Sequence, residues 1–249
     1  MRTELRCVAC FLPLTLIVTG LAACGGSGES TLHHRLGHCH RRSDHRSRRA
    51  HLPGDDAQGN PQVLQLLIGA DGTLTPAGIA ARTGATAVGI TPSGTTAYLL
   101  SSCIDNLCDG QVAPSSIGSN GAFTQAATPT PTGRHENPVA IVFDSLAANA
   151  YMLVNLMGVD TDIGRMQPYA IGAEGVLTSH SSGALPITGT AVAESALGSD
   201  LYTLSGGPPE EVPVTAQIQH FVMAAGGLRA MAAMPVAGTP TAMALAVPH

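Results

Sequence analysis

The sequence contains no lysine and no tryptophan, and aromatic residues make up only 3% of its 249 residues. Charged residues are also scarce, at 12%. From residue 62 onward, four arginines stand against twelve acidic residues, which gives this part a formal charge of −8. An acidic body argues against nucleic acid as a partner.

Glycine and proline are abundant instead, with 29 and 17 copies. Between them lie short runs of small and β-branched residues. Turn formers that separate short apolar runs favour many short strands joined by tight turns over long helices. We therefore expect an all-β protein.

The first 24 residues have the layout of a secretory signal peptide. Arg2 and Arg6 flank the start, an apolar stretch too short to span a membrane comfortably follows, and "LAAC" ends at Cys24. This ending resembles the bacterial lipobox, whose cysteine is lipidated and becomes the new N-terminus. The resemblance implies a lipid-anchored protein outside the cytoplasm, in the periplasm, on the outer membrane or at the cell surface.

Residues 25–61 are predicted to be a disordered tether, because they begin rich in Gly and Ser and show no apolar periodicity. Six arginines lie between residues 31 and 51, and Cys39 stands among six histidines: His33, His34, His38, His40, His45 and His51. Three interpretations remain open here. The tract is a solvated linker or the product of a shifted reading frame, a metal-binding element, or a contact to anionic lipid headgroups.

A short motif recurs along the rest of the chain. The copies are "IGADGTL", "IGSNGAF", "IGAEGVL" and the looser "VMAAGGL". Their second glycines are 49, 54 and 52 residues apart, at Gly72, Gly121, Gly175 and Gly227. A period near fifty built from short strands indicates a β-propeller with one four-stranded blade per repeat.

Tyrosines recur in step with the glycine motif, at Tyr98, Tyr151 and Tyr202. Turn pairs such as Asn120–Gly121 mark tight hairpins, because both residues tolerate a positive φ. The strands expected in the first complete unit are about Thr86–Thr91, Thr95–Ser102, Gly110–Gly118 and Ala122–Thr128. The next units are expected to begin near Val139 and Ala191.

The domain at 62–249 therefore holds about three full blades plus partial ones. Two strands, Gln62–Gly69 and Thr73–Ala80, precede the first full blade, and one inner strand near Pro240–Val247 follows the third. Together these end strands would build one further blade, whose second, tyrosine-bearing strand is missing from this count. A four-bladed ring short of one strand, an open arc that dimerises and a truncated product all fit. We favour an open arc, whose exposed blade edges favour self-association.

The absence of tryptophan and the irregular glycine pairs do not fit a kelch propeller. The sequence pattern of Ile68–Ser102 instead resembles that of the lactonase-like propellers, the family of 6-phosphogluconolactonase and the YVTN surface-layer repeats. The resemblance covers roughly residues 62–249. It implies blades around a central channel and, as one activity, hydrolysis of sugar lactones. Family members usually carry about twice as many repeats.

Loops entering the inner strands line one mouth of a propeller, and "GRHENP" is the most polar of them. Arg134, His135 and Glu136 could supply a cation, a general base and a carboxylate there. The corresponding stretches elsewhere add only Arg82, and one loop does not make a hydrolase site.

We therefore expect a membrane-anchored binding or surface protein with an unassigned ligand and no cofactor or metal. A lactonase-type hydrolase is the alternative function. Cys103 and Cys108, five residues apart in a loop, are expected to form a disulfide outside the cytoplasm.

Overall fold

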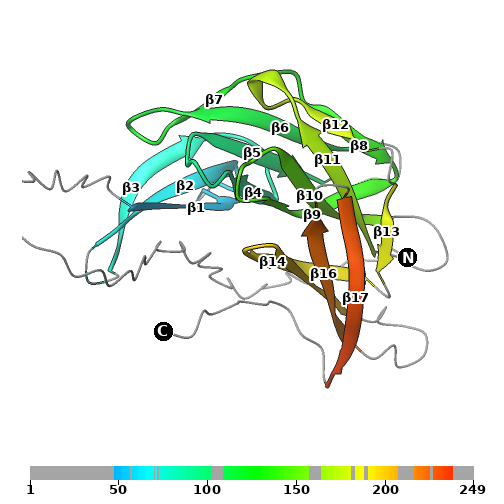
Figure 1. The fold of residues 1–249 in the computed structure, drawn as a ribbon. Coiled ribbons are helices and arrows are strands. Elements are labelled where there is room, and N and C mark those ends of the chain that lie inside the picture. Colours follow the sequence, from blue (N-terminus) through cyan, green and yellow to red (C-terminus); the bar gives the residue numbers. More distant parts are fainter. Residues whose placement is uncertain are drawn as a thin grey trace, which may run out of the picture.

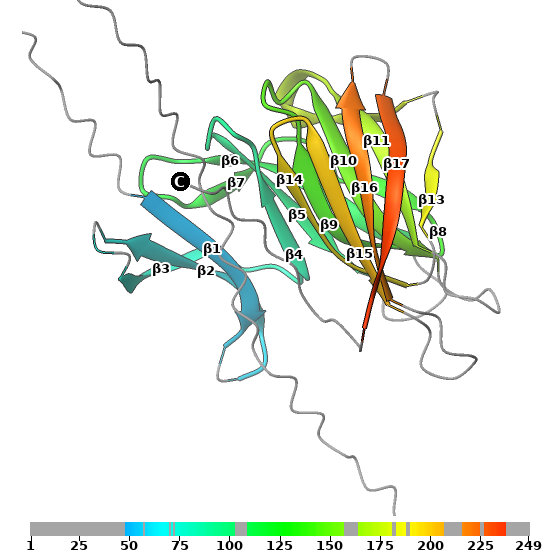
Figure 2. The same cartoon turned by 60° about the horizontal axis from the view of Figure 1, so that its bottom comes forward.

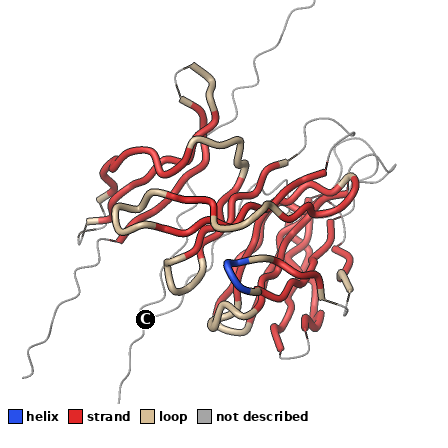
Figure 3. The backbone as a smooth tube through the Cα atoms, turned by 90° about the horizontal axis from the view of Figure 1, so that it is seen from above, coloured by secondary structure: helices blue, strands red, loops and turns tan. Residues whose placement is uncertain are grey.

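The computed structural model describes the chain from residue 48 to residue 237, with gaps. The described ranges are 48–56, 58–69, 71, 73–102, 109–156, 164–180, 183–187, 190–206, 216–224 and 227–237. They contain strands β1 to β17 and one short 3-10 segment, η1 (Ala173–Gly175), arranged in four antiparallel sheets. Figure 3 shows how completely strands dominate this part of the chain. The all-β, propeller-blade fold expected from the repeat is confirmed.

Sheets 2, 3 and 4 are the three complete blades (Figure 1). Sheet 2 consists of β4 (Ala87–Ile90), β5 (Thr96–Ser101), β6 (Asp109–Ile117) and β7 (Phe123–Gln125), with β8 (Thr130–Arg134) also paired to β6. Sheet 3 consists of β9 (Glu136–Phe143), β10 (Asn149–Leu156), β11 (Gly164–Ile171) and β12 (Leu177–Ser179), with β13 (Leu185–Ile187) also paired to β11. Sheet 4 consists of β14 (Thr190–Leu197), β15 (Asp200–Gly206), β16 (Ala216–Ala224) and β17 (Gly227–Val236).

The outer strand of sheet 2 differs from the prediction, because it is split in two. β7 and β8 both pair with β6, one after the other along its length. Pro129 lies between them and Pro131 within β8, and a proline has no N–H to donate to a ladder, which suits it to an interrupted edge strand. The predicted connection at 132–138 is consequently strand on both sides of His135.

Sheet 1 contains a strand that the sequence analysis assigned to the tether. β1 (Arg48–Asp55) pairs along its whole length with β2 (Pro61–Ile68), which in turn pairs with β3 (Leu74–Ala81). The predicted tether boundary at residue 61 is therefore wrong for residues 48–55. A basic stretch with a proline and a glycine carries no alternation of its own, and it becomes a strand by pairing with β2.

β1 fills the position of the second, tyrosine-bearing strand, which the sequence count lacked. Tyr98, Tyr151 and Tyr202 each pair with a residue seven positions before the second glycine of the repeat motif. His51 pairs with Gln65, which is also seven positions before that glycine, Gly72. The register thus places His51 where the other blades have tyrosine. The inner strand predicted near Pro240–Val247 lies outside the described residues.

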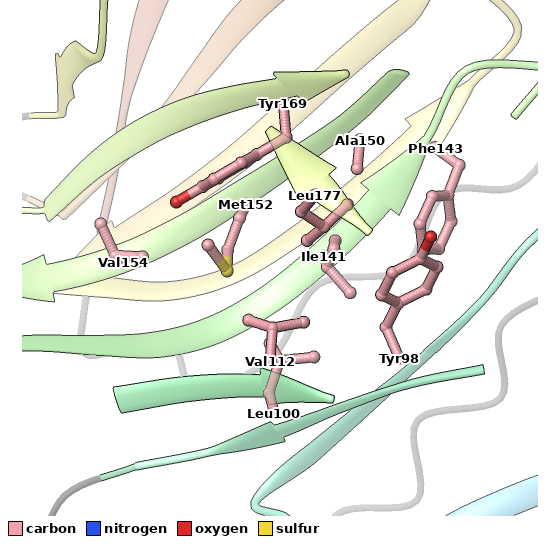
Figure 4. Packing of buried hydrophobic residues seen from close by; sticks show 10 residues of the cluster. All are labelled: Tyr98, Leu100, Val112, Ile141, Phe143, Ala150, Met152, Val154, Tyr169 and Leu177. Carbon is pink, nitrogen blue, oxygen red and sulfur yellow. The ribbon is translucent and has the colours of Figure 1, made fainter. Parts of the chain in front are cut away.

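Successive sheets pack face to face through three apolar clusters. Between sheets 2 and 3, Tyr98, Leu100 and Val112 meet residues such as Ile141 and Met152, as Figure 4 shows. A second cluster joins sheets 3 and 4, and a smaller one joins sheets 1 and 2. The four sheets therefore form one continuous arc, with sheet 1 at one end and sheet 4 at the other (Figures 1 and 2).

Close approach of the inner strands depends on Gly89 in β4. A Cβ at this position would collide with the side chain of Ile141 in β9 and would lie 3.0 Å from the Ile141 carbonyl oxygen. Since these are the inner strands of neighbouring blades, the glycine sets how closely sheets 2 and 3 meet. Within the described ranges, no helix is long and apolar enough to cross a bilayer.

Candidate functional site

The predicted polar loop is a tight corner between β8 and β9. Arg134 is the last residue of β8 and is exposed, His135 forms the corner with a φ of 62°, and Glu136 begins β9. The three residues are adjacent in the chain, but they do not converge on one open pocket. Glu136 is 7% exposed and points into the protein, whereas Arg134 faces solvent.

Glu136 forms an ion pair with Arg165 on β11. The guanidinium Nη2 of Arg165 donates to the carboxylate Oε1 of Glu136, and the two side chains are 27% and 9% exposed. The pair joins the start of an inner strand to the third strand of the same blade. The sequence offered no signal for this partner, because the two residues are 29 positions apart and meet only when sheet 3 forms.

The local backbone is built around the buried carboxylate. A Cβ at Gly133, whose φ is 132°, would lie 2.7 Å from the Glu136 carboxyl carbon, so only glycine leaves room there. The Thr132 hydroxyl lies 2.8 Å from the carbonyl oxygen of Glu136 and 3.1 Å from that of Gly110. These contacts fix the backbone of the corner.

Burial dominates the electrostatics of this cluster. Desolvation raises the pKa of Glu136, and Arg165 partly opposes the rise. Burial also raises the pKa of Tyr169 to about 12, with a further contribution from the nearby Glu136 charge. Within the described residues, three atoms here are buried without a hydrogen-bond partner: Glu136 Oε2, His135 Nδ1 and Arg165 Nε.

Such a corner is poorly suited to general base catalysis. A base must reach the proton of a bound water or substrate, and one oxygen of Glu136 is held by Arg165 while the other is enclosed. The arrangement instead ties the start of β9 to β11 and orients the first residues of β9.

Two clefts that the sequence analysis missed lie elsewhere. One of about 310 Å³ lies between sheet 2 and the β11–β12 connection, and its hydroxyl-bearing lining residues are Thr91, Ser93, Thr96, Tyr98 and Ser116. Glu174 contributes the carboxylate in this lining. The Ser93 hydroxyl lies within hydrogen-bonding distance of two others, 3.1 Å from the Thr91 hydroxyl and 2.8 Å from the Thr95 hydroxyl. The other cleft, of about 460 Å³, hollows the outward face of sheet 1.

Sheet 4 carries a further polar cluster. The ring nitrogen Nε2 of His220 lies 2.7 Å from a carboxylate oxygen of Asp200, and the Tyr202 ring stacks on the imidazole at 4.7 Å. The cluster lies on the face of sheet 4 that is turned away from sheet 3. It is an imidazole–carboxylate pair beside a tyrosine ring.

Several predicted site residues lie outside the described residues. They are Cys24, Cys103, Cys108 and the histidine-rich tract before residue 48, so lipidation, the disulfide and metal binding by the tract stay predictions. In the described ranges, no three His, Cys, Asp or Glu side chains gather as a metal site would require.

Comparisons with known proteins give fold neighbours only. No protein-family profile and no curated protein matches the chain. Among solved structures, the β-propeller domain of the trilobed protease from Pyrococcus furiosus aligns with a TM-score of 0.39 and 6% identity, over 74% of this chain and 53% of that one. The acylaminoacyl peptidase of Pyrococcus horikoshii aligns with a TM-score of 0.41 and 9% identity, over 74% of this chain and 30% of that one.

A puromycin hydrolase aligns with a TM-score of 0.32 and 12% identity, covering 68% of this chain and 33% of its own. The chain thus spans about half or less of the structures it resembles. At these scores, the sheet order and register described above carry the assignment to the propeller fold.

Proposed function

We propose that this protein is a β-propeller binding module of the lactonase-like type, held to a bacterial membrane by lipid on Cys24. The repeat cadence of Ile68–Ser102 supports the family, and "LAAC" after a short apolar stretch supports the anchor. The molecule would then act outside the cytoplasm, in the periplasm or at the surface, as a binding or surface protein. Its ligand is not specified by the sequence or by the clefts.

One observation carries the preference for binding over hydrolysis. Glu136, the carboxylate of the most polar mouth loop, is buried and paired with Arg165. Lactone hydrolysis needs a base that can activate water and donors for the developing oxyanion, in a walled pocket. The hydroxyl-rich cleft supplies hydrogen-bonding groups, and its carboxylate, Glu174, is exposed to solvent, which suits recognition of a ligand better than lactone hydrolysis.

Fractionation of cells tests the anchored, extracytoplasmic role. The chain should sediment with membranes and be extracted by detergent, whereas the Cys24→Ser variant should lose the lipid. A conservative control is Cys39→Ser, which leaves the lipobox intact and should stay membrane-bound. Recovery of a processed, membrane-bound Cys24→Ser protein would contradict the lipid anchor.

The alternative function, a lactonase-type hydrolase, is testable by a pH-stat assay with δ- and γ-lactones. We expect no turnover above background for the purified chain. The assay also includes Glu136→Gln, which keeps the size of the side chain and a hydrogen bond to Arg165, and His135→Ala. Turnover that disappears in both variants would replace the binding role with hydrolysis. Turnover that survives in both would place hydrolysis at a different site and would likewise contradict the preference for binding, while leaving the structural account of this corner intact.

A further inference from the structure

Two of the interfaces between neighbouring sheets use one ring of the second strand in the same way. His51 of β1 faces sheet 2, where its ring lies 4.6 Å from the Phe123 ring and its Nε2 lies 3.4 Å from the Gly121 carbonyl oxygen. Tyr98 of β5 faces sheet 3, where its ring lies 5.2 Å from that of Phe143. Its hydroxyl donates to the carbonyl oxygen of Gly175 at 2.9 Å.

The two glycine acceptors are the same residue of the repeat, because Gly121 and Gly175 are both the second glycine of the motif. Tyr151 of β10 continues the pattern, since it is 2% exposed in the cluster that includes Leu201 and Phe221 of sheet 4. At the interfaces of sheet 1 with sheet 2 and of sheet 2 with sheet 3, a ring on one sheet thus meets the motif turn of the next. Besides the apolar clusters, these interfaces hold a few polar contacts, in which Arg49, Gln65 and Ser102 donate to the carbonyl oxygens of Ser119, Asn120 and Pro138, respectively.

Sheet 4 presents the same ring without a following sheet in the described part of the chain. Tyr202 is the equivalent residue, and it is half-buried where Tyr98 and Tyr151 are 0% and 2% exposed. Alternation and register place Ile218, Val222 and Met234 on its face, because Leu201, Phe221 and Met223 point to sheet 3. Met234 is 58% exposed. We call this the Tyr202 face.

Sheet 1 has the complementary uncovered surface at the opposite end of the arc. Val63 packs toward sheet 2, so the alternate residues Leu64 and Leu66 point outward, paired with Ile79 and Pro76. Ile79 is 40% exposed, and these four side chains line the cleft of about 460 Å³. We call this the Leu64 face. In sheets 2, 3 and 4, the equivalent face packs against the preceding sheet.

We propose that the Tyr202 face of one copy packs on the Leu64 face of a second copy of this chain. A two-fold axis would repeat the contact, so that two arcs of four sheets close into one ring of eight. Continuity with the three interfaces inside the chain supports this partner. The ring residue, apolar side chains around the Asp200–His220 pair, and the receiving side are all present at the arc ends, and none has a counterpart among the described residues. Sheets 1 and 4 of one copy lie at opposite ends of its arc, so the second copy is the simplest occupant.

Sedimentation velocity tests the proposal on a chain exported with a soluble leader and carrying Cys24→Ser, so that lipid cannot mediate association. We expect a dimer at micromolar concentration. Tyr202→Arg and Ile79→Arg should each weaken dimerisation at least about tenfold, because each damages both copies of the contact. Leu146→Arg is the matched control. This residue is 86% exposed in the turn between β9 and β10, and the variant should dimerise like the parent chain.

Mixing distinguishes this dimer from other assemblies. Tyr202→Arg and Ile79→Arg chains together retain one undamaged contact and should associate more tightly than either variant alone. Circular dichroism and the thermal midpoint check that both variants fold. A parent chain that stays monomeric at all concentrations, variants that dimerise like the parent, or a mixture no tighter than its components would each overturn the proposal.

Discussion

At the residue scale, the Glu136–Arg165 pair shows how a polar motif can serve the fold. Replacing Arg165 with Met would leave the Glu136 carboxylate buried without its cation. We expect this to lower the free energy of unfolding by roughly 2–4 kcal/mol, measured by urea denaturation. The double variant Glu136→Leu, Arg165→Met should recover part of that loss. Exposed Arg134→Ala should stay within about 0.5 kcal/mol of the parent, and an Arg165→Met chain as stable as the parent would contradict the buried pair.

The same carboxylate should make stability depend on pH. Burial raises the pKa of Glu136 above its ordinary value of 4.5. Between that value and the higher pKa of the fold, the folded chain binds more protons than the unfolded chain, so the contribution of Glu136 to stability falls as pH rises. The free energy of unfolding of the parent minus that of Glu136→Gln should therefore decrease as pH rises through this window. A difference that increases with pH would contradict the assignment.

His51 should have a pH effect of the opposite sign. Desolvation lowers its pKa from 6.5, with a smaller effect of Arg49 in the same direction, while the Gly121 carbonyl opposes it. As pH falls below 6.5, the unfolded chain takes up a proton before the folded chain does, so stability is lost. His51→Tyr, which supplies the residue found in the other blades, should fold and should remove this loss. Urea denaturation from pH 5 to 8 compares the two chains.

At the scale of the element, Gly89 decides how closely β4 and β9 approach. Gly89→Ala would force a methyl group against Ile141, and we expect a loss of about 1–3 kcal/mol from overpacking. Gly84→Ala is the control, because its Cβ would meet no atom within 4 Å. Calorimetry of both variants checks the prediction. An unchanged thermal midpoint for Gly89→Ala would show that the inner strands are not in close contact.

Elements with local signals were predictable from the sequence. The Asn120–Gly121 turn and the tyrosine spacing identify β5 to β7 because hairpin turns and strand alternation are short-range properties. β1 has no such signal and is a strand through its pairing with β2. The partner of Glu136 was equally hidden, since Arg165 reaches it through the register of β9, β10 and β11. The split of the outer strand at Pro129 could have been read from the prolines.

At the scale of the whole molecule, the chain forms four propeller sheets in an open arc whose first sheet begins inside the basic, histidine-rich stretch. Three of the four sheets repeat the same strand order, and the first lacks an inner strand in the described residues. Both ends of the arc carry partly exposed apolar side chains.

Arg48–Asp55 forms the second strand of a blade, with His51 in the place of tyrosine. Residue-resolved hydrogen exchange by mass spectrometry tests it most directly. We predict that the β1 amides bonded to β2 exchange about as slowly as those of β2, and far more slowly than amides of the predicted tether before residue 48. Exchange of residues 48–55 at the rate of that tether would contradict the four-sheet arc. It would leave three blades and the two-stranded β2–β3 hairpin.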